Sequence, residues 1–132
     1  MLQIVKMTEK ERKILISFYE RRMDGIKFIA WLPKTGLACY NNGVCIAAMA
    51  VYFDSSSPVA VAGWCATEPN NSYRLSYEAV CELIKALPKY CQCYNVKHLL
   101  TIFGARSINN ILDKNGFIAG DSNVLEKYKS LR

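Results

Sequence analysis

The sequence lacks several features that would assign a function directly. It has one histidine, His98, and none of its six cysteines forms a CxxC pair, so no zinc-binding spacing is present. Its longest uninterrupted apolar run, residues 44–53, is about half as long as a membrane-spanning helix requires. Internal repeats, low-complexity segments and clusters of one charge are also missing. The sequence therefore predicts no metal site and no membrane association.

The cysteines lie where buried thiols are expected. Cys39, Cys45, Cys65 and Cys81 stand within apolar stretches, where an unpaired cysteine behaves as a small hydrophobic residue. Charges interrupt the apolar residues at the beginning of the chain, which is unlike a secretory signal. Because unpaired thiols suit a reducing compartment, we expect a cytoplasmic protein.

The composition is that of one folded domain. The chain has 132 residues, of which 52% are hydrophobic and 21% charged, so we expect a single domain over residues 1–132 with its own core. Its 17 basic and 11 acidic residues give a formal net charge of +6. This charge favours an anionic partner, such as nucleic acid, an acidic protein or a phosphorylated cofactor, but scattered basic residues also serve solubility alone.

The first half of the chain alternates strand and helix signals. Thr8 and Glu11 form a capping box at the start of a helix, and the Asn42-Gly43 pair favours a tight hairpin. Residues 26–32 are apolar and ambiguous between helix and strand. The sequence predicts a strand over residues 2–7, a helix from Thr8 to about Arg22, and a hairpin that pairs residues 37–40 with Val44–Phe53.

The second half continues with longer apolar segments. Ser72 or Asn71 can cap a long helix that Pro88 ends or kinks, and Gly116 is a typical helix stop. The predicted elements are a strand over residues 59–67, that long helix, a strand over 96–103, a helix over 107–114, and closing strands over 117–119 and 124–128. This order predicts a mixed α/β domain whose strands are grouped in the middle.

The end of the last predicted helix resembles a known family. Residues 111–117, Ile-Leu-Asp-Lys-Asn-Gly-Phe, are similar to the leucine-tyrosine-glutamate-lysine-x-glycine-phenylalanine ending of GNAT domains, the acyl-CoA-dependent N-acetyltransferases. The order of elements resembles the same fold. The resemblance implies an α/β (α+β) single domain with a central mixed, mostly antiparallel sheet flanked by helices, and central strands that part to hold the cofactor.

The chain departs from the family pattern where the chemistry lies. The stretch that corresponds to the family's pyrophosphate loop, residues 71–76, has Arg74 and Ser76 where small residues are usual. Leu112 stands at the position of the tyrosine that many members use as general acid, and Ala105 replaces an asparagine at the start of that helix. Asn109 and Asn110 lie one turn further on. An arginine in the loop either blocks the approach of backbone to phosphate or replaces amides with a side-chain clamp.

The resemblance implies acetyl-CoA as co-substrate and assigns residues to it. Backbone groups at the end of the apolar strand would hold the pantetheine arm, and the turn into the long helix would hold the pyrophosphate. Glu68 would take the amine proton, directly or through water. Tyr77 and Tyr73, at the start of the long helix, are the candidates to replace the missing acid, and Tyr77 is the one that we assign to catalysis. The cofactor-binding residues are then Cys65, Ala66, Thr67, Ser72, Tyr73, Arg74, Leu75, Ser76 and Asn110.

Two functions follow from these observations. The first is transfer of an acetyl group from acetyl-CoA to an amine of a small molecule or protein. The second is a GNAT-like module that has lost catalysis and binds a protein or nucleic acid, which Leu112 and the glycine-poor loop favour. An incomplete final hairpin would also leave a sheet edge that a second copy of the chain could cover.

Overall fold

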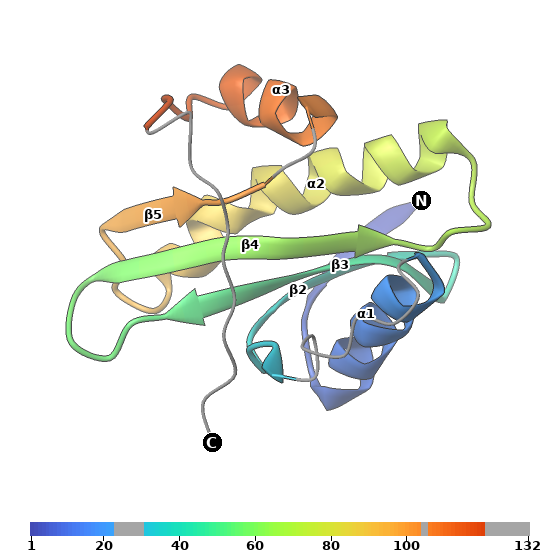
Figure 1. Cartoon of the computed structure of the whole chain (residues 1–132), viewed down its shortest axis with the longest axis horizontal. Helices are drawn as coiled ribbons and strands as arrows, with labels where there is room; N and C mark the ends of the chain where they lie inside the picture. Colours follow the sequence, from blue (N-terminus) through green and yellow to red (C-terminus); the bar gives the residue numbers. More distant parts are fainter. Residues whose placement is uncertain (23–30, 104–105, 121–132) are drawn as a thin grey trace.

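Within the residues that the structure describes, the fold is built on one five-stranded sheet whose strands follow each other in chain order (Figure 1). The computed structural model describes residues 1–22, 31–103 and 106–120. Neighbouring strands are antiparallel except for the last pair, which is parallel. The strands are β1 (Leu2–Lys6), β2 (Gly36–Asn41), β3 (Val44–Phe53), β4 (Val59–Thr67) and β5 (His98–Thr101).

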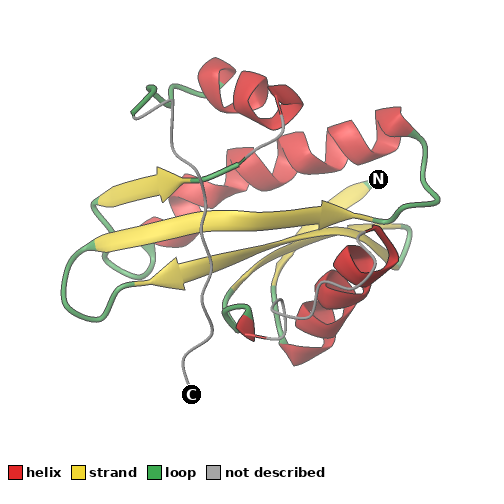
Figure 2. Cartoon of the chain, viewed as in Figure 1, coloured by secondary structure: helices red, strands yellow, loops and turns green. Residues whose placement is uncertain are grey.

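Helices cover both faces of this sheet (Figure 2). Helix α1 (Glu9–Arg22) packs on one face, and α2 (Tyr73–Gln92) with α3 (Arg106–Lys114) packs on the other. Two apolar cores result, one on each side, so β3 between them is buried along most of its length. This explains why β3 and β4 are apolar on both faces rather than alternating. None of the described helices is both long and apolar enough to cross a membrane.

The two glycine signals in the sequence mark the turns that they predicted. Asn42 and Gly43 adopt φ angles of 50° and 83° between the paired residues Asn41 and Val44, which is the tight hairpin expected of Asn-Gly. Gly116 has a φ of 84° and ends α3 in a Schellman motif. The N–H of Phe117 donates to the carbonyl of Leu112 at 3.1 Å, and Phe117 packs on the core.

The capping box at the start of α1 also forms, with one difference. The Glu11 carboxylate accepts from the Thr8 N–H at 2.8 Å, as predicted, but the Thr8 hydroxyl donates to the same carboxylate at 2.6 Å. The Tyr40 hydroxyl of β2 donates to the other oxygen. Burial opposes the charge on Glu11, yet these hydrogen bonds lower its pKa to about 2. The buried Glu11 carboxylate therefore caps α1 and also joins this helix to the sheet.

Several sequence predictions are wrong in detail. Pro88 does not end α2, which runs through it to Gln92, because Leu87, Tyr90 and Cys91 on either side of the proline are buried in the core. The alternative that Pro88 kinks the helix stays a prediction. Residues 117–119 form no strand, and β5 is shorter than residues 96–103. The segments 26–30 and 124–128 lie outside the described residues, as does Ala105.

The cysteine prediction is half confirmed. All six thiols are free, and Cys39 and Cys45 are buried. Cys65 and Cys81 are partly exposed, whereas Cys91, which was not among the predicted four, is buried. The difference arises because α2 turns Cys91 into the core and because β4 lies beside a cavity at Cys65.

Candidate functional site

The parallel pair β4 and β5 separates halfway along β4. The two strands are paired only over residues 59–62 and 98–101. One further bond follows, from the Ile102 N–H to the Ala62 carbonyl at 3.0 Å. Residues 64–67 of β4 remain paired with β3 on their other side. No described strand pairs with this second half of β4 on the side of β5, so one edge of it is left open.

An irregularity in the sheet decides which backbone groups point to that open edge. The register between β3 and β4 shifts at Ala50 and Val51, opposite Gly63, which is the mark of a β-bulge. Beyond it the Glu68 N–H donates to the Ile46 carbonyl of β3. Because backbone groups alternate along a strand, those of Cys65 and Thr67 point the other way, to the open edge.

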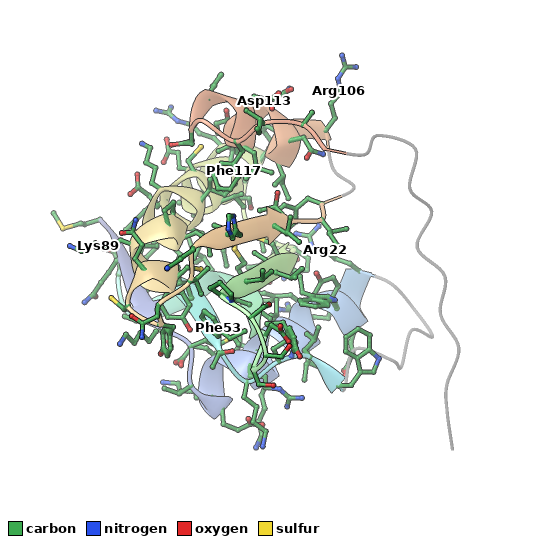
Figure 3. The ribbon with its side chains drawn as sticks, turned by 90° about the vertical axis from the view of Figure 1, so that its left-hand side faces the viewer. Arg22, Phe53, Lys89, Arg106, Asp113 and Phe117 are labelled. Atoms are coloured by element: carbon green, nitrogen blue, oxygen red, sulfur yellow. The ribbon has the colours of Figure 1, made fainter. Side chains whose placement is uncertain are left out.

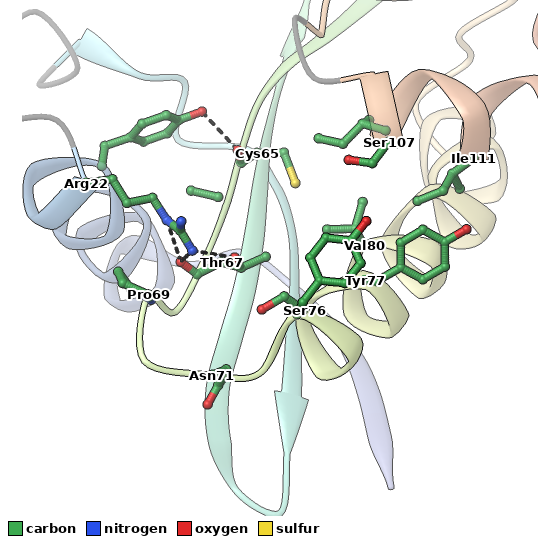
Figure 4. A pocket seen from close by; sticks show the side chains of 14 residues that line it. Arg22, Cys65, Thr67, Pro69, Asn71, Ser76, Tyr77, Val80, Ser107 and Ile111 are labelled. Carbon is green, nitrogen blue, oxygen red and sulfur yellow. Dashed lines mark hydrogen bonds between the residues drawn. The ribbon is translucent and has the colours of Figure 1, made fainter.

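A cavity of about 580 Å³ lies along this edge (Figure 4). The end of β4 forms one wall, the first turns of α2 form the floor, and α3 forms the opposite wall. The last turn of α1 contributes Tyr19 and Arg22. The lining residues are Tyr19, Arg22, Cys65, Ala66, Thr67, Pro69, Asn71, Tyr73, Ser76, Tyr77, Val80, Ser107, Ile108 and Ile111.

Side chains of α1 reach the open edge of β4. The Tyr19 hydroxyl donates to the Cys65 carbonyl at 3.2 Å. The Arg22 guanidinium donates twice to the Thr67 carbonyl, at 2.9 and 3.2 Å, and once to the Thr67 hydroxyl at 2.7 Å (Figure 4). Both outward-facing carbonyls of the open edge are therefore hydrogen-bonded by α1.

Glu68 forms an ion pair with the neighbouring arginine. The two terminal guanidinium nitrogens of Arg21 donate to the Glu68 carboxylate at 2.7 Å each, the bidentate geometry that favours this pair. The hydrogen bonds from Arg21 lower the pKa of Glu68 below its usual value, which makes the carboxylate a weaker base. Glu68 follows β4 directly but is not one of the residues that line the cavity. Its role as general base stays a prediction.

The start of α2 presents unpaired backbone donors. Ser72 is the N-cap residue, and its hydroxyl accepts from the Leu75 N–H at 3.2 Å. The Ser76 N–H bonds the Ser72 carbonyl. Among the described residues, none accepts from the N–H groups of Tyr73 and Arg74. These groups lie at the positive end of the helix dipole and are suited to an anion.

Asn71, just before this helix, carries a second unsatisfied donor. Its Nδ2 atom is buried, and no described residue accepts a hydrogen bond from it. A buried polar group without a partner is costly, and Asn71 lines the cavity. A ligand with acceptor oxygens would relieve this cost.

The predicted cofactor residues divide into two groups. Cys65, Ala66, Thr67, Tyr73 and Ser76 line the cavity together, whereas the other four, Ser72, Arg74, Leu75 and Asn110, are not among its lining residues. The Arg74 side chain is 89% exposed and pairs with Glu78 at 3.2 Å, and Asn110 is exposed on α3. Assignment of all nine to the cofactor stays a prediction.

Two residues bear on the missing general acid. Leu112 is 3% exposed and belongs to the apolar core, so this position packs against other residues instead of facing the cavity. Tyr77 does line the cavity, and its ring stacks on Tyr73 at 6.1 Å. No described residue hydrogen-bonds its hydroxyl. A phenol is therefore available from α2 instead of α3.

Sequence reasoning missed the contribution of α1. Tyr19 reads as part of an apolar helix stripe, and Arg21 and Arg22 read as a basic helix end. Their pairing with β4 depends on the crossing of two elements far apart in the chain. Ser107 and Ile111 were also missed; their spacing of four residues on a helix places them on one face, which could have marked a cavity wall.

Thiol chemistry in the cavity is restricted. Cys65 lines the cavity and is partly exposed as a residue. Burial of its thiol raises the pKa of Cys65 to about 12, so the thiol is neutral at physiological pH. Since the thiolate is the reactive form, Cys65 is poorly suited to carry an acyl group.

Comparison with solved structures defines the class of fold. An aminoglycoside acetyltransferase from an uncultured soil metagenomic sample, solved with sisomicin, superposes with a TM-score of 0.68 at 14% identity. The match covers 99% of this chain and 97% of that one. A ribosomal-protein-alanine N-acetyltransferase from Brucella melitensis biovar Abortus 2308 gives 0.69 at 12% identity, over 97% and 99% of the two chains.

A third structure was determined with a cofactor analogue. The aminoglycoside N-acetyltransferase AAC(6′)-Iy, bound to a bisubstrate analogue of CoA and acetylneamine, gives a TM-score of 0.69 at 13% identity, over 98% and 99% of the two chains. No family model and no curated protein sequence matches the chain. The likeness is thus one of structure, and it shows that this chain has the GNAT fold.

Proposed function

We propose that this protein is an N-acetyltransferase that moves an acetyl group from acetyl-CoA to an amine. The observation that carries the proposal is the open edge of β4, which faces a cavity beside the start of α2. Solved proteins of the same fold include enzymes bound to CoA or to a CoA analogue. The acceptor is a small molecule or a protein with a reactive amine; its identity is left open.

The open edge suits the pantetheine arm of the cofactor. This arm carries two amides, and an extended chain with amides can pair with a strand edge through backbone hydrogen bonds. Cys65 and Thr67 supply that edge, and Ala66 stands between them. The apolar side chains of Val80, Ile108 and Ile111 would cover the arm from α2 and α3.

The start of α2 suits the pyrophosphate of the same molecule. The N–H groups of Tyr73 and Arg74, with the helix dipole, would bind phosphate oxygens. Ser72 and Leu75 fix the first turn, and Ser76 lines the cavity above it. Arg74 can add its charge only if it leaves Glu78. Asn110, exposed on α3 outside the cavity lining, would contact only a part of the carrier that extends beyond the cavity.

The reaction is direct attack in a ternary complex. The amine nitrogen attacks the thioester carbonyl carbon, a tetrahedral intermediate forms, and the carbon–sulfur bond breaks. The nitrogen loses a proton and the departing sulfur gains one. Because the Cys65 thiol is neutral, no acyl-enzyme on this residue is needed or favoured.

Two residues would move these protons. Glu68, through a water, would take the proton of the amine, and its pairing with Arg21 favours this indirect route over direct contact. Tyr77 would give a proton to the sulfur from the floor of the cavity. The second role replaces the tyrosine that Leu112 does not provide.

One observation favours a second function. Leu112 is packed in the core, so the fold could retain the cavity as a binding site for the acyl carrier, for a protein or for nucleic acid without catalysis. Incubation with acetyl-CoA and a panel of polyamines, amino acids and peptides separates the two. Acetylated product by mass spectrometry with matching thiol release supports the transferase. Saturable binding of acetyl-CoA with no product from any amine would contradict it and favour the binding module.

A further inference from the structure

Arg22 stands out among the residues that line the cavity. It is the one charged side chain among the fourteen described lining residues. Its recorded hydrogen bonds go only to the carbonyl and hydroxyl of Thr67, which are neutral groups. No described carboxylate forms an ion pair with it, whereas the adjacent Arg21 is neutralised by Glu68. Arg22 therefore brings to the cavity wall a positive charge that has no ion-pair partner among the described residues, although the Glu68 carboxylate is near enough for this charge to help lower its pKa.

The partners of Arg22 are groups that a ligand on the open edge would need. The Thr67 carbonyl faces that edge, and the guanidinium occupies it with two hydrogen bonds. An extended arm that pairs with β4 would compete for this acceptor. The cofactor of the proposed function cannot form its full set of bonds to β4 while Arg22 stays where it is.

We propose that Arg22 occupies the β4 edge in the free protein and binds the phosphates of the acyl carrier in the complex. Binding of the carrier moves the guanidinium from the first position to the second. This inference rests on the proposed function. With the cavity empty, Arg22 caps Thr67. When the pantetheine arm takes the Thr67 carbonyl, the guanidinium turns to the phosphates at the start of α2, where Asn71, Tyr73 and Ser76 line the same cavity (Figure 4).

The exchange is favourable because of the charges involved. Arg22 gives up hydrogen bonds to neutral oxygens and gains bonds to anionic phosphate oxygens, in which Coulomb attraction between opposite charges adds to the hydrogen bond. The planar fork of arginine suits two phosphate oxygens at once. An acyl carrier without phosphates would displace Arg22 from Thr67 without forming a new contact with the guanidinium. Arg22 therefore makes the site select phosphorylated carriers.

The test compares two ligands with one variant. Acetyl-CoA and S-acetylpantetheine share the thioester and the pantetheine arm, but only the first has phosphates. In the Arg22→Ala variant, calorimetric titration should show acetyl-CoA binding weakened about tenfold, because the charged contact is lost. S-acetylpantetheine binding should become about threefold tighter, because Thr67 is no longer occupied.

Control variants show whether the opposite changes in the two affinities are specific to Arg22. Lys89→Ala removes one positive charge at the far end of α2, well apart from Arg22 (Figure 3), and should leave both affinities unchanged. Arg22→Met, of similar length and without a hydrogen-bond donor, should repeat the pattern of Arg22→Ala if the alanine variant folds poorly. Parallel weakening of both ligands, or no change in their ratio, overturns the inference while the proposed function stands. If the unmodified protein binds neither ligand, both the inference and the proposed function are wrong.

Discussion

At the scale of single residues, the candidate site differs from the GNAT pattern in the helices from which its tyrosines come. The position expected to hold a tyrosine, Leu112, is part of the core, while Tyr77 of α2 and Tyr19 of α1 line the cavity. The Tyr19 hydroxyl already donates to the Cys65 carbonyl. Tyr77 is therefore the better candidate for a proton donor to sulfur.

Replacing Tyr77 tests this assignment. In Tyr77→Phe we expect kcat for acetyl transfer to fall by about a hundredfold or more, the usual loss when a positioned acid is removed. Affinity for acetyl-CoA should stay within about twofold, since the ring remains. Steady-state kinetics with saturating amine measure the first, and titration calorimetry the second.

A matched substitution shows whether the effect is specific. Tyr52→Phe removes the hydroxyl from a partly exposed residue on β3 that does not line the cavity, and it should leave kcat unchanged. An unchanged kcat in Tyr77→Phe as well would show that the proton comes from another group.

Glu11 makes a prediction about stability and pH. Its pKa in the folded protein is about 2, below the unfolded value of about 4.3. A lowered folded pKa stabilises the fold above the unfolded pKa, and this contribution is lost as pH falls from about 5 to about 2. In Glu11→Gln, the free energy of unfolding at pH 7 should fall by roughly 2 kcal/mol, because charge-assisted bonds from Thr8 and Tyr40 are lost.

Urea unfolding as a function of pH measures this effect. The unmodified protein should lose stability between about pH 5 and pH 2 more steeply than Glu11→Gln. Glu9→Gln, which removes an exposed carboxylate paired with Arg12 on the same helix, should change stability by less than about 0.5 kcal/mol. If stability depends on pH equally in the unmodified protein and in Glu11→Gln, then the Glu11 carboxylate does not stabilise the link between α1 and the sheet.

At the scale of elements, α2 continues through a proline. Pro88 is exposed and removes one backbone donor from the helix interior, while Leu87 and Tyr90 beside it are buried. We expect Pro88→Ala to raise the free energy of unfolding by about 1–2 kcal/mol, since the restored helical bond outweighs the extra entropy of the unfolded chain.

Thermal and urea unfolding of Pro88→Ala show whether the free energy of unfolding rises or falls. Lys89→Ala, at the next exposed position of the helix, controls for changes in helix propensity and should alter stability by less than about 0.5 kcal/mol. A destabilised Pro88→Ala would indicate that the proline shapes the helix in a way that the core requires.

The elements that the sequence predicted correctly share local signals. Asn42-Gly43, Ser72 and Gly116 each fix a turn or a helix end through their own backbone or side chain, so β2, β3, α2 and α3 could be placed from the sequence. Pro88 misled because packing on the core outweighs one missing hydrogen bond. The bulge at Gly63 and the parting of β4 from β5 depend on contacts between strands, which no local pattern encodes.

The site was predictable to the same extent. Residues that end β4 and begin α2, from Cys65 to Ser76, could be placed because they are continuous in the chain. Arg22 and Tyr19 could not, because α1 meets β4 only in the folded protein. Arg74 was favoured by its position in the sequence, but its side chain faces solvent and Glu78.

At the scale of the whole molecule, the sheet ends at β5 with apolar side chains exposed. Leu100 is 56% and Ile102 62% exposed, and no described strand pairs with the outer edge of β5. A homodimer that covers this edge stays a prediction, as does the nucleic-acid partner suggested by the net charge of +6. Neither is required for the cavity, which lies on the other side of β5 between β4, α2 and α3.

The central claim is that the cavity at the open edge of β4 binds acetyl-CoA, and thermal unfolding with and without the cofactor tests it most directly. At a hundred times its dissociation constant, a ligand stabilises the folded state by about 2.7 kcal/mol, which for a domain of this size raises the melting temperature by several degrees. The account predicts such a shift, saturating with acetyl-CoA. An unchanged melting temperature at millimolar acetyl-CoA would contradict it.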